Sequence, residues 1–267
     1  MKRSERACAI TQILTEHPNR DFTLGVFAEK FGCAKSSISE DLRVVRIAVD
    51  AAGLGYIETT SGAKGGVRFV PYANDDMLKT DLLRLQEALE EQDRVVGGGF
   101  LYTSDLMFNP EVIRVAARVF AKKFAALSAD FVVTVETRGI GVAMLTAELL
   151  NLPLIVLGRE ARVTDGPTLS INYFAGSTDS IQKMSVSKRA IKNGQKGIII
   201  DDFMRRGGSV KGIEDMLREF GAGVAGVGVV IATSTPRDKK IGNYLPIMIL
   251  DNTQDGKTIS INSEIVK

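Results

Sequence analysis

Two adjacent carboxylates, Asp201 and Asp202, follow an apolar run at residues 198–200, and the loop after them ends in Gly-Gly-Ser at 207–209. The run is typical of a buried strand, and we expect the loop to lead into a helix. Glycines let a backbone approach an anion closely, and a helix N-terminus favours negative charge. Carboxylates repel phosphate, so this pair suits ribose hydroxyls, directly or through bound Mg²⁺. The stretch predicts a sugar-phosphate site, although a strand, acidic residues and a helix also follow one another by chance.

Two cations, Arg205 and Arg206, stand inside this loop. Arginine cannot act as a general base, because the pKa of its side chain stays above about 12. Its planar guanidinium can instead hold a phosphate through two parallel hydrogen bonds. The pair therefore favours binding of a polyanion, and the alternative is that one of the two arginines points to solvent.

Length, composition and charge are those of an ordinary globular protein. The chain has 267 residues, of which 45% are apolar and 25% charged. A net charge of +2, from 34 basic and 32 acidic residues, gives no overall positive field that would indicate nucleic-acid binding. No signal peptide and no apolar run of about 20 residues is present, so we expect no membrane partner. The two cysteines, Cys8 and Cys33, lie far apart, and a reduced cytoplasmic protein is the simplest interpretation.

The first 70 residues have the pattern of a small DNA-binding domain. An apolar stripe over 5–17 ends at Pro18, and a second helix is expected between a capping Thr23 and Gly32. A third helix rich in serine and lysine follows from residue 34, and strands at 56–60 and 67–70 flank a turn of small residues at 61–66. Three helices and a hairpin in this order predict a winged helix-turn-helix, which places its last helix in the major groove.

Candidate DNA contacts lie on the third helix and at the hairpin tip. Residues 1–73 hold ten Lys/Arg against eight Asp/Glu, so this argument rests on where the charges lie. Lysine neutralises phosphate, and small hydroxyl side chains approach phosphates and base edges. The alternative is that the serines only cap and solvate a helix. The predicted DNA-binding residues are Lys35, Ser36, Ser37, Ser39 and Arg43 on the helix, and Lys64, Gly65 and Gly66 in the hairpin.

The hydrophobic period changes beyond a boundary that we place near residue 74, which divides the chain into domains 1–73 and 74–267. A charged segment at 77–93 is expected to be a helical connector. Strands are then expected at 131–135, 153–157, 196–200 and 224–231, with helices at 139–150 and 208–220. Alternating strands and helices predict an α/β domain with a parallel sheet, whose ligands bind at the carboxyl ends of the strands.

At this point the second domain resembles the type I phosphoribosyltransferase family. That family's signature is four apolar residues, two acidic residues and a loop closing in Gly-Gly-Thr or similar, which residues 198–209 resemble. Residues 190–195 resemble the family's approach to this strand, residues 135–140 its pyrophosphate loop, and residues 170–173 lie where the family has a flexible hood. The resemblance implies that phosphoribosyl pyrophosphate, with a possible Mg²⁺ at Asp201 and Asp202, contacts the following residues: Thr137, Arg138, Gly139, Tyr173, Asp201, Asp202, Phe203, Met204, Arg205, Arg206, Gly207, Gly208 and Ser209.

A winged helix joined to such a domain resembles the purine operon repressors of Gram-positive bacteria along nearly the whole chain. The resemblance implies a homodimer that binds double-stranded operator DNA, is released by phosphoribosyl pyrophosphate, and can also bind competing purine nucleotides. It also suggests that Tyr102 reaches the effector, while from the sequence alone a core tyrosine is an equal alternative.

Catalysis is a separate question for this resemblance. In the enzymes the position of Arg206 is commonly Thr or Ser, so the loop looks modified for holding a polyanion, and we expect no transferase activity and no obligatory cofactor. The rival hypothesis is an active purine phosphoribosyltransferase that carries an N-terminal helical domain.

Overall fold

The computed structural model describes residues 1–60, 65–72, 74–90, 94–96, 100–161, 163–175, 180–253 and 256–265. These residues form two compact units, Met1–Met77 with Glu148–Asn151, and Leu78–Ala147 with Leu152–Lys267. The boundary predicted near residue 74 adjoins residue 73, which lies outside the described residues.

The N-terminal unit is a winged helix-turn-helix, as predicted. Its elements are α1 (Arg3–Glu16), α2 (Leu24–Phe31), α3 (Lys35–Ala52) and the antiparallel hairpin β1 (Gly55–Thr60) and β2 (Gly66–Pro71). One apolar side chain or more from each of these elements is fully or nearly fully buried, among them Ile10, Phe27, Ile38 and Val67. Gly32 ends α2 in the left-handed conformation, at φ 61°, which glycine adopts without steric cost. Thr23 lies at the predicted cap position, but its side chain makes no capping hydrogen bond.

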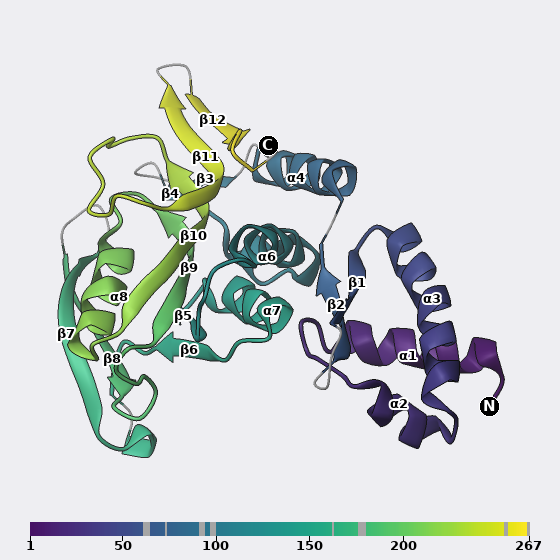
Figure 1. Ribbon diagram of the computed structural model, residues 1–267. Coiled ribbons are helices and arrows are strands. Elements are labelled where there is room, and N and C mark those ends of the chain that lie inside the picture. Colours follow the sequence, from purple (N-terminus) through teal and green to yellow (C-terminus); the bar gives the residue numbers. More distant parts are fainter. Residues whose placement is uncertain are drawn as a thin grey trace. The chain divides into compact units, whose positions relative to one another are not determined.

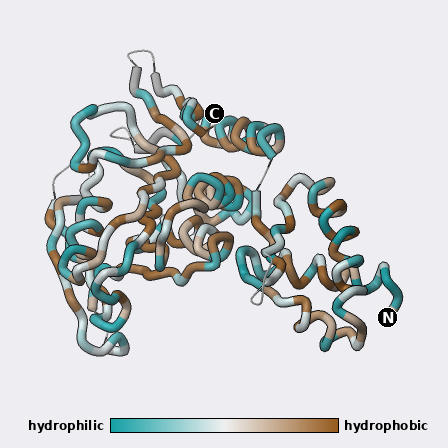
Figure 2. Tube along the Cα trace, in the orientation of Figure 1, coloured by the Kyte–Doolittle hydropathy of each residue, from teal (hydrophilic) through white to brown (hydrophobic). Residues whose placement is uncertain are grey.

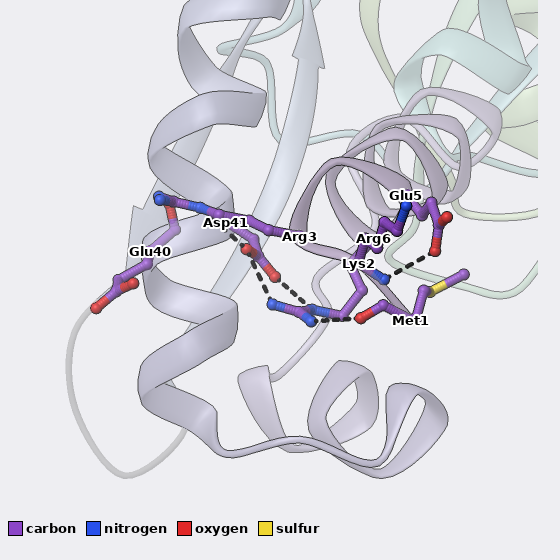
Figure 3. Close-up of polar contacts among 7 residues, drawn as sticks. All are labelled: Met1, Lys2, Arg3, Glu5, Arg6, Glu40 and Asp41. Atoms are coloured by element: carbon purple, nitrogen blue, oxygen red, sulfur yellow. Dashed lines mark hydrogen bonds and ion pairs between the residues drawn. The ribbon is translucent and has the colours of Figure 1, made fainter.

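A buried ion pair fastens α3 to α1 (Figure 3). Asp41 of α3 is fully buried, and Arg6 of α1 donates to both of its carboxylate oxygens, at 2.8 and 3.3 Å. This hydrogen bonding raises the pKa of Arg6. Arg3 adds an ion pair at 3.6 Å to the same carboxylate and donates to the backbone carbonyl of Glu40. The exposed side of α3 is therefore held in one orientation relative to α1.

The second unit is built on a six-stranded sheet in the order β12-β11-β10-β9-β5-β6 (Figure 1). Its strands are β5 (Phe131–Val135), β6 (Leu154–Leu157), β9 (Lys196–Met204), β10 (Gly223–Thr233), β11 (Leu245–Thr253) and β12 (Gly256–Ile261). All neighbouring pairs are parallel except β11 and β12. The predicted parallel sheet is confirmed, with an antiparallel strand added at one edge.

Helices cover both faces of this sheet. On one side lie α6 (Pro110–Phe124) and α7 (Ile140–Leu150), and on the other lies α8 (Gly208–Glu219) (Figure 1). A Cβ at Gly228 of β10 would lie 2.6 Å from the ring of Phe120, so α6 packs directly on the strand. The connector α4 (Asp75–Glu90) alternates hydrophilic and hydrophobic residues along its length (Figure 2), and it buries Leu78, Leu82, Leu85 and Leu89.

A long antiparallel hairpin, β7 (Thr168–Ala175) and β8 (Ser180–Ser187), packs against the outer side of α8. A Cβ at Gly212 would lie 2.9 Å from Tyr173, so the glycine allows this close approach. The remaining elements are β3 (Val95–Val96), β4 (Phe100–Leu101), α5 (Ser104–Met107) and a 3₁₀ turn at Val163–Asp165. In the part of the chain that the structure describes, no helix has the length and apolar content needed to cross a lipid bilayer.

The strand predicted at 196–200 continues to Met204. Its pairing with β10 extends through Asp201↔Val229 and Phe203↔Ile231, which keeps the acidic pair inside the strand. Asp201 and Asp202 therefore lie within a regular strand, before its last two residues, and not in the loop after it, so their backbone positions are set by the sheet.

Candidate functional site

A cavity of about 500 Å³ opens at the carboxyl ends of β5 and β9. The two strands, the N-terminus of α8 and the β7–β8 hairpin all contribute to its wall. The lining residues are Ser104, Val135, Glu136, Thr137, Arg138, Arg159, Tyr173, Gln182, Asp201, Asp202, Phe203, Met204, Arg205, Arg206, Gly207, Gly208, Ser209 and Val210.

The acidic pair is buried in the wall of this cavity. Asp201 is 5% and Asp202 8% exposed, and burial raises the pKa of both carboxyls, most strongly that of Asp201. The charge of Asp202 raises the pKa of Asp201 further, because two adjacent carboxylates cannot both ionise cheaply in a dry site. Arg138 opposes this effect from 3.1 Å, the distance from its Nε to Oδ2 of Asp202. The pair can hold a proton when the cavity is empty and accept hydroxyl donors when it is filled.

The loop Arg205–Ser209, here called the phosphate loop, turns from β9 into α8. Gly207 has φ 80°, a conformation that side-chain-bearing residues rarely adopt, and it forms the N-cap of the helix. Gly208 and Ser209 begin the helix, so their N–H groups lie at its positive end. Arg205 and Arg206 are exposed at the rim. The loop can bind an anion through both backbone and guanidinium groups.

A second loop, residues 136–139, follows β5 on the other side of the acidic pair. Glu136 accepts a hydrogen bond from the backbone N–H of Arg159, at 3.1 Å, which ties the loop to the residues after β6. Gly139 packs so closely that a Cβ there would lie 2.6 Å from Oγ1 of Thr134 and 3.4 Å from Oδ1 of Asp201. Only glycine therefore fits behind the carboxylates.

The β7–β8 hairpin closes the cavity on a third side. Tyr173 and Gln182 are cross-strand neighbours, and the tyrosine hydroxyl donates to Oε1 of the glutamine at 3.0 Å. Burial, and then the nearby carboxylate of Asp201, raise the pKa of Tyr173, while the charge of Arg159 lowers it. The hydroxyl therefore stays protonated and available as a polar group.

Most of the residues predicted for the effector line this one cavity. The exceptions are Gly139, which lies directly behind it, and Tyr102, which is 49% exposed and does not line it. Contact of Tyr102 with a ligand stays a prediction. Three polar lining residues had no sequence motif to mark them, namely Ser104, Arg159 and Gln182. Glu136 lies within residues 135–140, which resemble the pyrophosphate loop, but it was not named as a contact, whereas Gln182 is brought in only by its pairing with Tyr173.

On the winged helix, the predicted DNA-binding side chains of α3 lie mainly on its outer face. Lys35, Ser36, Ser39 and Arg43 are exposed and Ser37 is half-buried. Within the hairpin, Gly65 is half-buried, and Gly66 is buried with a Cβ position 3.1 Å from the carbonyl of Phe22. Lys64 lies outside the described residues. The exposed set can reach a nucleic-acid backbone, and its contact with DNA stays a prediction.

The donor set suits a magnesium ion only as part of a ligand complex. No group of three or more His, Cys, Asp or Glu side chains is placed to hold a metal within the described ranges. Oδ2 of Asp202 is buried and accepts no hydrogen bond, although Arg138 is close to it. Mg²⁺ commonly takes one or two carboxylates and completes its shell with water and substrate phosphates. Asp201 and Asp202 fit that role.

The sheet, the flanking helices and the cavity together define a phosphoribosyltransferase-type domain on a chain that begins with a winged helix. Residues 103–257 match the model of the phosphoribosyl transferase domain, and residues 2–71 match that of the bacterial purine repressor N-terminal domain. An adenine phosphoribosyltransferase from Saccharomyces cerevisiae has the same fold, with a TM-score of 0.54 and 18% identity over 63% of this chain and 97% of that chain.

Two-domain regulators match over nearly the whole length. The purine biosynthesis transcriptional repressor PurR of Bacillus subtilis is 36% identical, covering 93% of this chain and 87% of that protein. The transcriptional activator PurR of Lactococcus lactis is also 36% identical, covering 94% and 93%. A xanthine phosphoribosyltransferase of Oenococcus oeni is 30% identical over 66% of this chain and 89% of the enzyme. The chain belongs to the family of bacterial purine biosynthesis transcriptional regulators, which confirms the resemblance inferred from the sequence.

Proposed function

We propose that this protein is a DNA-binding transcriptional repressor of purine biosynthesis genes and that phosphoribosyl pyrophosphate releases it from operator DNA. One observation carries the proposal. A single chain presents a winged helix with exposed Lys35 and Arg43, and a cavity in which two buried carboxylates lie between two anion-binding loops. The functional unit would be a homodimer, because winged helices normally bind paired half-sites.

The spacing of charges along the cavity supports this choice of effector. Phosphoribosyl pyrophosphate has a 5′-phosphate at one end, ribose hydroxyls in the middle and a pyrophosphate at the other end. The phosphate loop takes the 5′-phosphate at the N-terminus of α8. Asp201 and Asp202 accept the ribose hydroxyls, and the 137–139 loop with Arg138 faces the pyrophosphate. Mg²⁺ entering with the pyrophosphate would neutralise part of its charge at the same carboxylates.

Purine nucleotides carry the same ribose 5-phosphate group, so they would compete for the same cavity. Their base is attached to the same ribose carbon as the pyrophosphate, and it would occupy space near the β7–β8 hairpin. A regulator with this site therefore responds to the ratio of the two ligand types.

The chemistry of the phosphate loop supports sensing without transfer. Arg205 and Arg206 cannot remove a proton, and both add positive charge where a product phosphate would have to leave. A second candidate, an active purine phosphoribosyltransferase, is favoured by the match to the xanthine enzyme over two thirds of the chain. We infer that the regulatory role holds, because the regulators match over more than nine tenths of it.

One experiment on the full chain separates these functions. Fluorescence anisotropy with labelled promoter DNA from a purine gene should show binding that phosphoribosyl pyrophosphate reverses and that purine nucleotides restore. In parallel, incubation with the sugar pyrophosphate and each purine base should yield no nucleotide. Turnover to nucleotide, or DNA binding that is indifferent to the effector, would contradict the proposal.

A further inference from the structure

The segment from Thr233 to Ile241, here called the strap, starts at the last residue of β10 and packs against the phosphate loop. Lys239 is the centre of this contact. Its ammonium donates to the carbonyl of Arg205 at 2.6 Å, to the carbonyl of Thr233 at 2.7 Å and to Oγ1 of Thr233 at 3.2 Å. Burial, and then the positive charge of Arg205, lower the pKa of this lysine. An ammonium with three acceptors in a partly dry site is a fixed structural group.

Three successive residues of the strap, 239–241, contact three successive residues of the phosphate loop, 205–207, in the same chain direction. After the bond from Lys239 to Arg205, the backbone N–H of Lys240 donates to the carbonyl of Arg206 at 2.9 Å. Ile241 then lies against Gly207, where a Cβ would come within 3.2 Å of its Cγ1. The whole first half of the loop is therefore seated on the strap.

These contacts with the strap determine where the backbone N–H donors of the phosphate loop point. The peptide bonds at Arg205–Arg206 and Arg206–Gly207 are trans, so each carbonyl and the N–H that follows it point to opposite sides. Two carbonyls held toward the strap turn the N–H groups of Arg206 and Gly207 away from it. The loop lines the cavity, whereas none of the described residues 233–241 does. The two N–H groups thus face the cavity side before any ligand arrives.

We propose that Lys239 is a positioning residue that holds the phosphate loop in its anion-binding conformation, and that it sets the affinity for the 5′-phosphate end of the ligand. The inference rests on the proposed function for the identity of that ligand. Lys239 acts through the backbone: its charge withdraws electrons from the Arg205 carbonyl, which makes the attached N–H a stronger donor. The pyrophosphate end, held by the 137–139 loop, is outside its reach.

The experiment compares Lys239→Met, which keeps the length of the side chain but removes its charge and donors, with the matched variant Arg237→Met. Arg237 is an exposed cation on the same strap. Calorimetry on the full chain would measure phosphoribosyl pyrophosphate, ribose 5-phosphate and inorganic pyrophosphate separately. Outer groups that orient direct ligands typically contribute 10–100-fold in affinity at metal sites, and we expect about the same loss here for the first two compounds. Pyrophosphate should bind as it does to the wild type, and Arg237→Met should change none of the three.

Hydrogen exchange of the peptide 203–209, measured without ligand, provides the second readout. Lys239→Met should accelerate it at least severalfold, while β5 exchanges at its normal rate. Equal affinities and equal exchange in the wild type and Lys239→Met would overturn the inference, as would a uniform loss for all three compounds. If the wild type binds none of the compounds, the proposed function fails, and the exchange measurement alone decides whether the strap holds the loop.

Discussion

Replacing Asp201 with asparagine should stabilise the empty protein and abolish its response to the effector. The carboxyl of Asp201 is buried, and its pKa is raised well above the usual 3.8, first by burial and then by Asp202. Asparagine has nearly the same shape and keeps an oxygen that can accept the N–H of Asp202, now bonded to Oδ1 at 3.0 Å. The substitution therefore removes a charge and leaves the packing and this hydrogen bond intact.

The stabilisation that Asp201→Asn brings should depend on pH, and the raised pKa of Asp201 determines the direction of that dependence. Between the ordinary value and the folded-state value, the unfolded chain has lost its proton while the folded chain keeps it. Stability of the wild type consequently falls as pH rises through this window, by about 1.4 kcal/mol for each unit by which the pKa is raised, and then levels off above the folded pKa. The asparagine variant lacks this loss. Its advantage should be small near pH 4 and greatest at pH 8.

Urea denaturation followed by circular dichroism, at pH 4.5, 6 and 8, measures this difference. The transition of the second unit must be fitted separately, because a two-domain chain need not unfold in one step. Asp238→Asn, at an exposed carboxyl of the strap, is the control and should show no such trend. A variant that is less stable at pH 8, or a difference that does not change with pH, would refute the argument. In the same protein, DNA binding should persist while phosphoribosyl pyrophosphate no longer reverses it.

Five further substitutions test other parts of the molecule. Arg205→Ala and Arg206→Ala should each weaken effector binding by about 1.5–3 kcal/mol, the scale of a charge-assisted hydrogen bond, and calorimetry that finds both unchanged would exclude a clamp. Lys64→Ala, and independently Lys35→Ala, should flatten the dependence of log DNA affinity on log salt by about one unit, and anisotropy titrations with an unchanged slope would mean that the side chain touches no phosphate. Gly207→Ala should cost about 1–2 kcal/mol of stability, because φ is 80° and Ile241 lies against the added methyl group, and scanning calorimetry with an unchanged Tm would contradict that strain.

The elements that could be predicted from the sequence are those with a strong hydrophobic period and clear ends. The strand at 131–135 is buried at every position, so an apolar run interrupted only by Thr134 identified it. Helix α2 ended where Gly32 indicated, since a left-handed residue stops the hydrogen-bond ladder. The acidic pair and the glycines of the phosphate loop were found for the same reason: their spacing is local, and their chemistry is carried within one short stretch.

The missed features depend on contacts between residues far apart in the chain. Gln182 enters the cavity wall only because β8 pairs in one register with β7, which places it opposite Tyr173. In the sequence, Asp41 is one more charged residue of a predicted helix with a polar side. Only the packing of α1 on α3 buries it and makes it the ion-pair partner of Arg6. Lys239 stands in a segment of polar residues that has no periodicity. Its role follows from a contact across 34 residues, which no local pattern predicts.

The strap also bears on why arginines can serve in this loop. A long exposed arginine side chain loses rotamer freedom when it binds a ligand. In a site made only of the Arg205 and Arg206 side chains, this entropy cost would therefore offset much of the binding free energy. Because the strap already holds their carbonyls, the backbone N–H groups of the loop need no ordering, and only the two side chains have to settle. Under the proposed function, the charges of Arg205 and Arg206 would then serve chiefly to attract the ligand and slow its escape. An enzyme would be hindered by slow escape of its product, whereas a sensor of ligand concentration makes no product and is helped by a long-lived bound state.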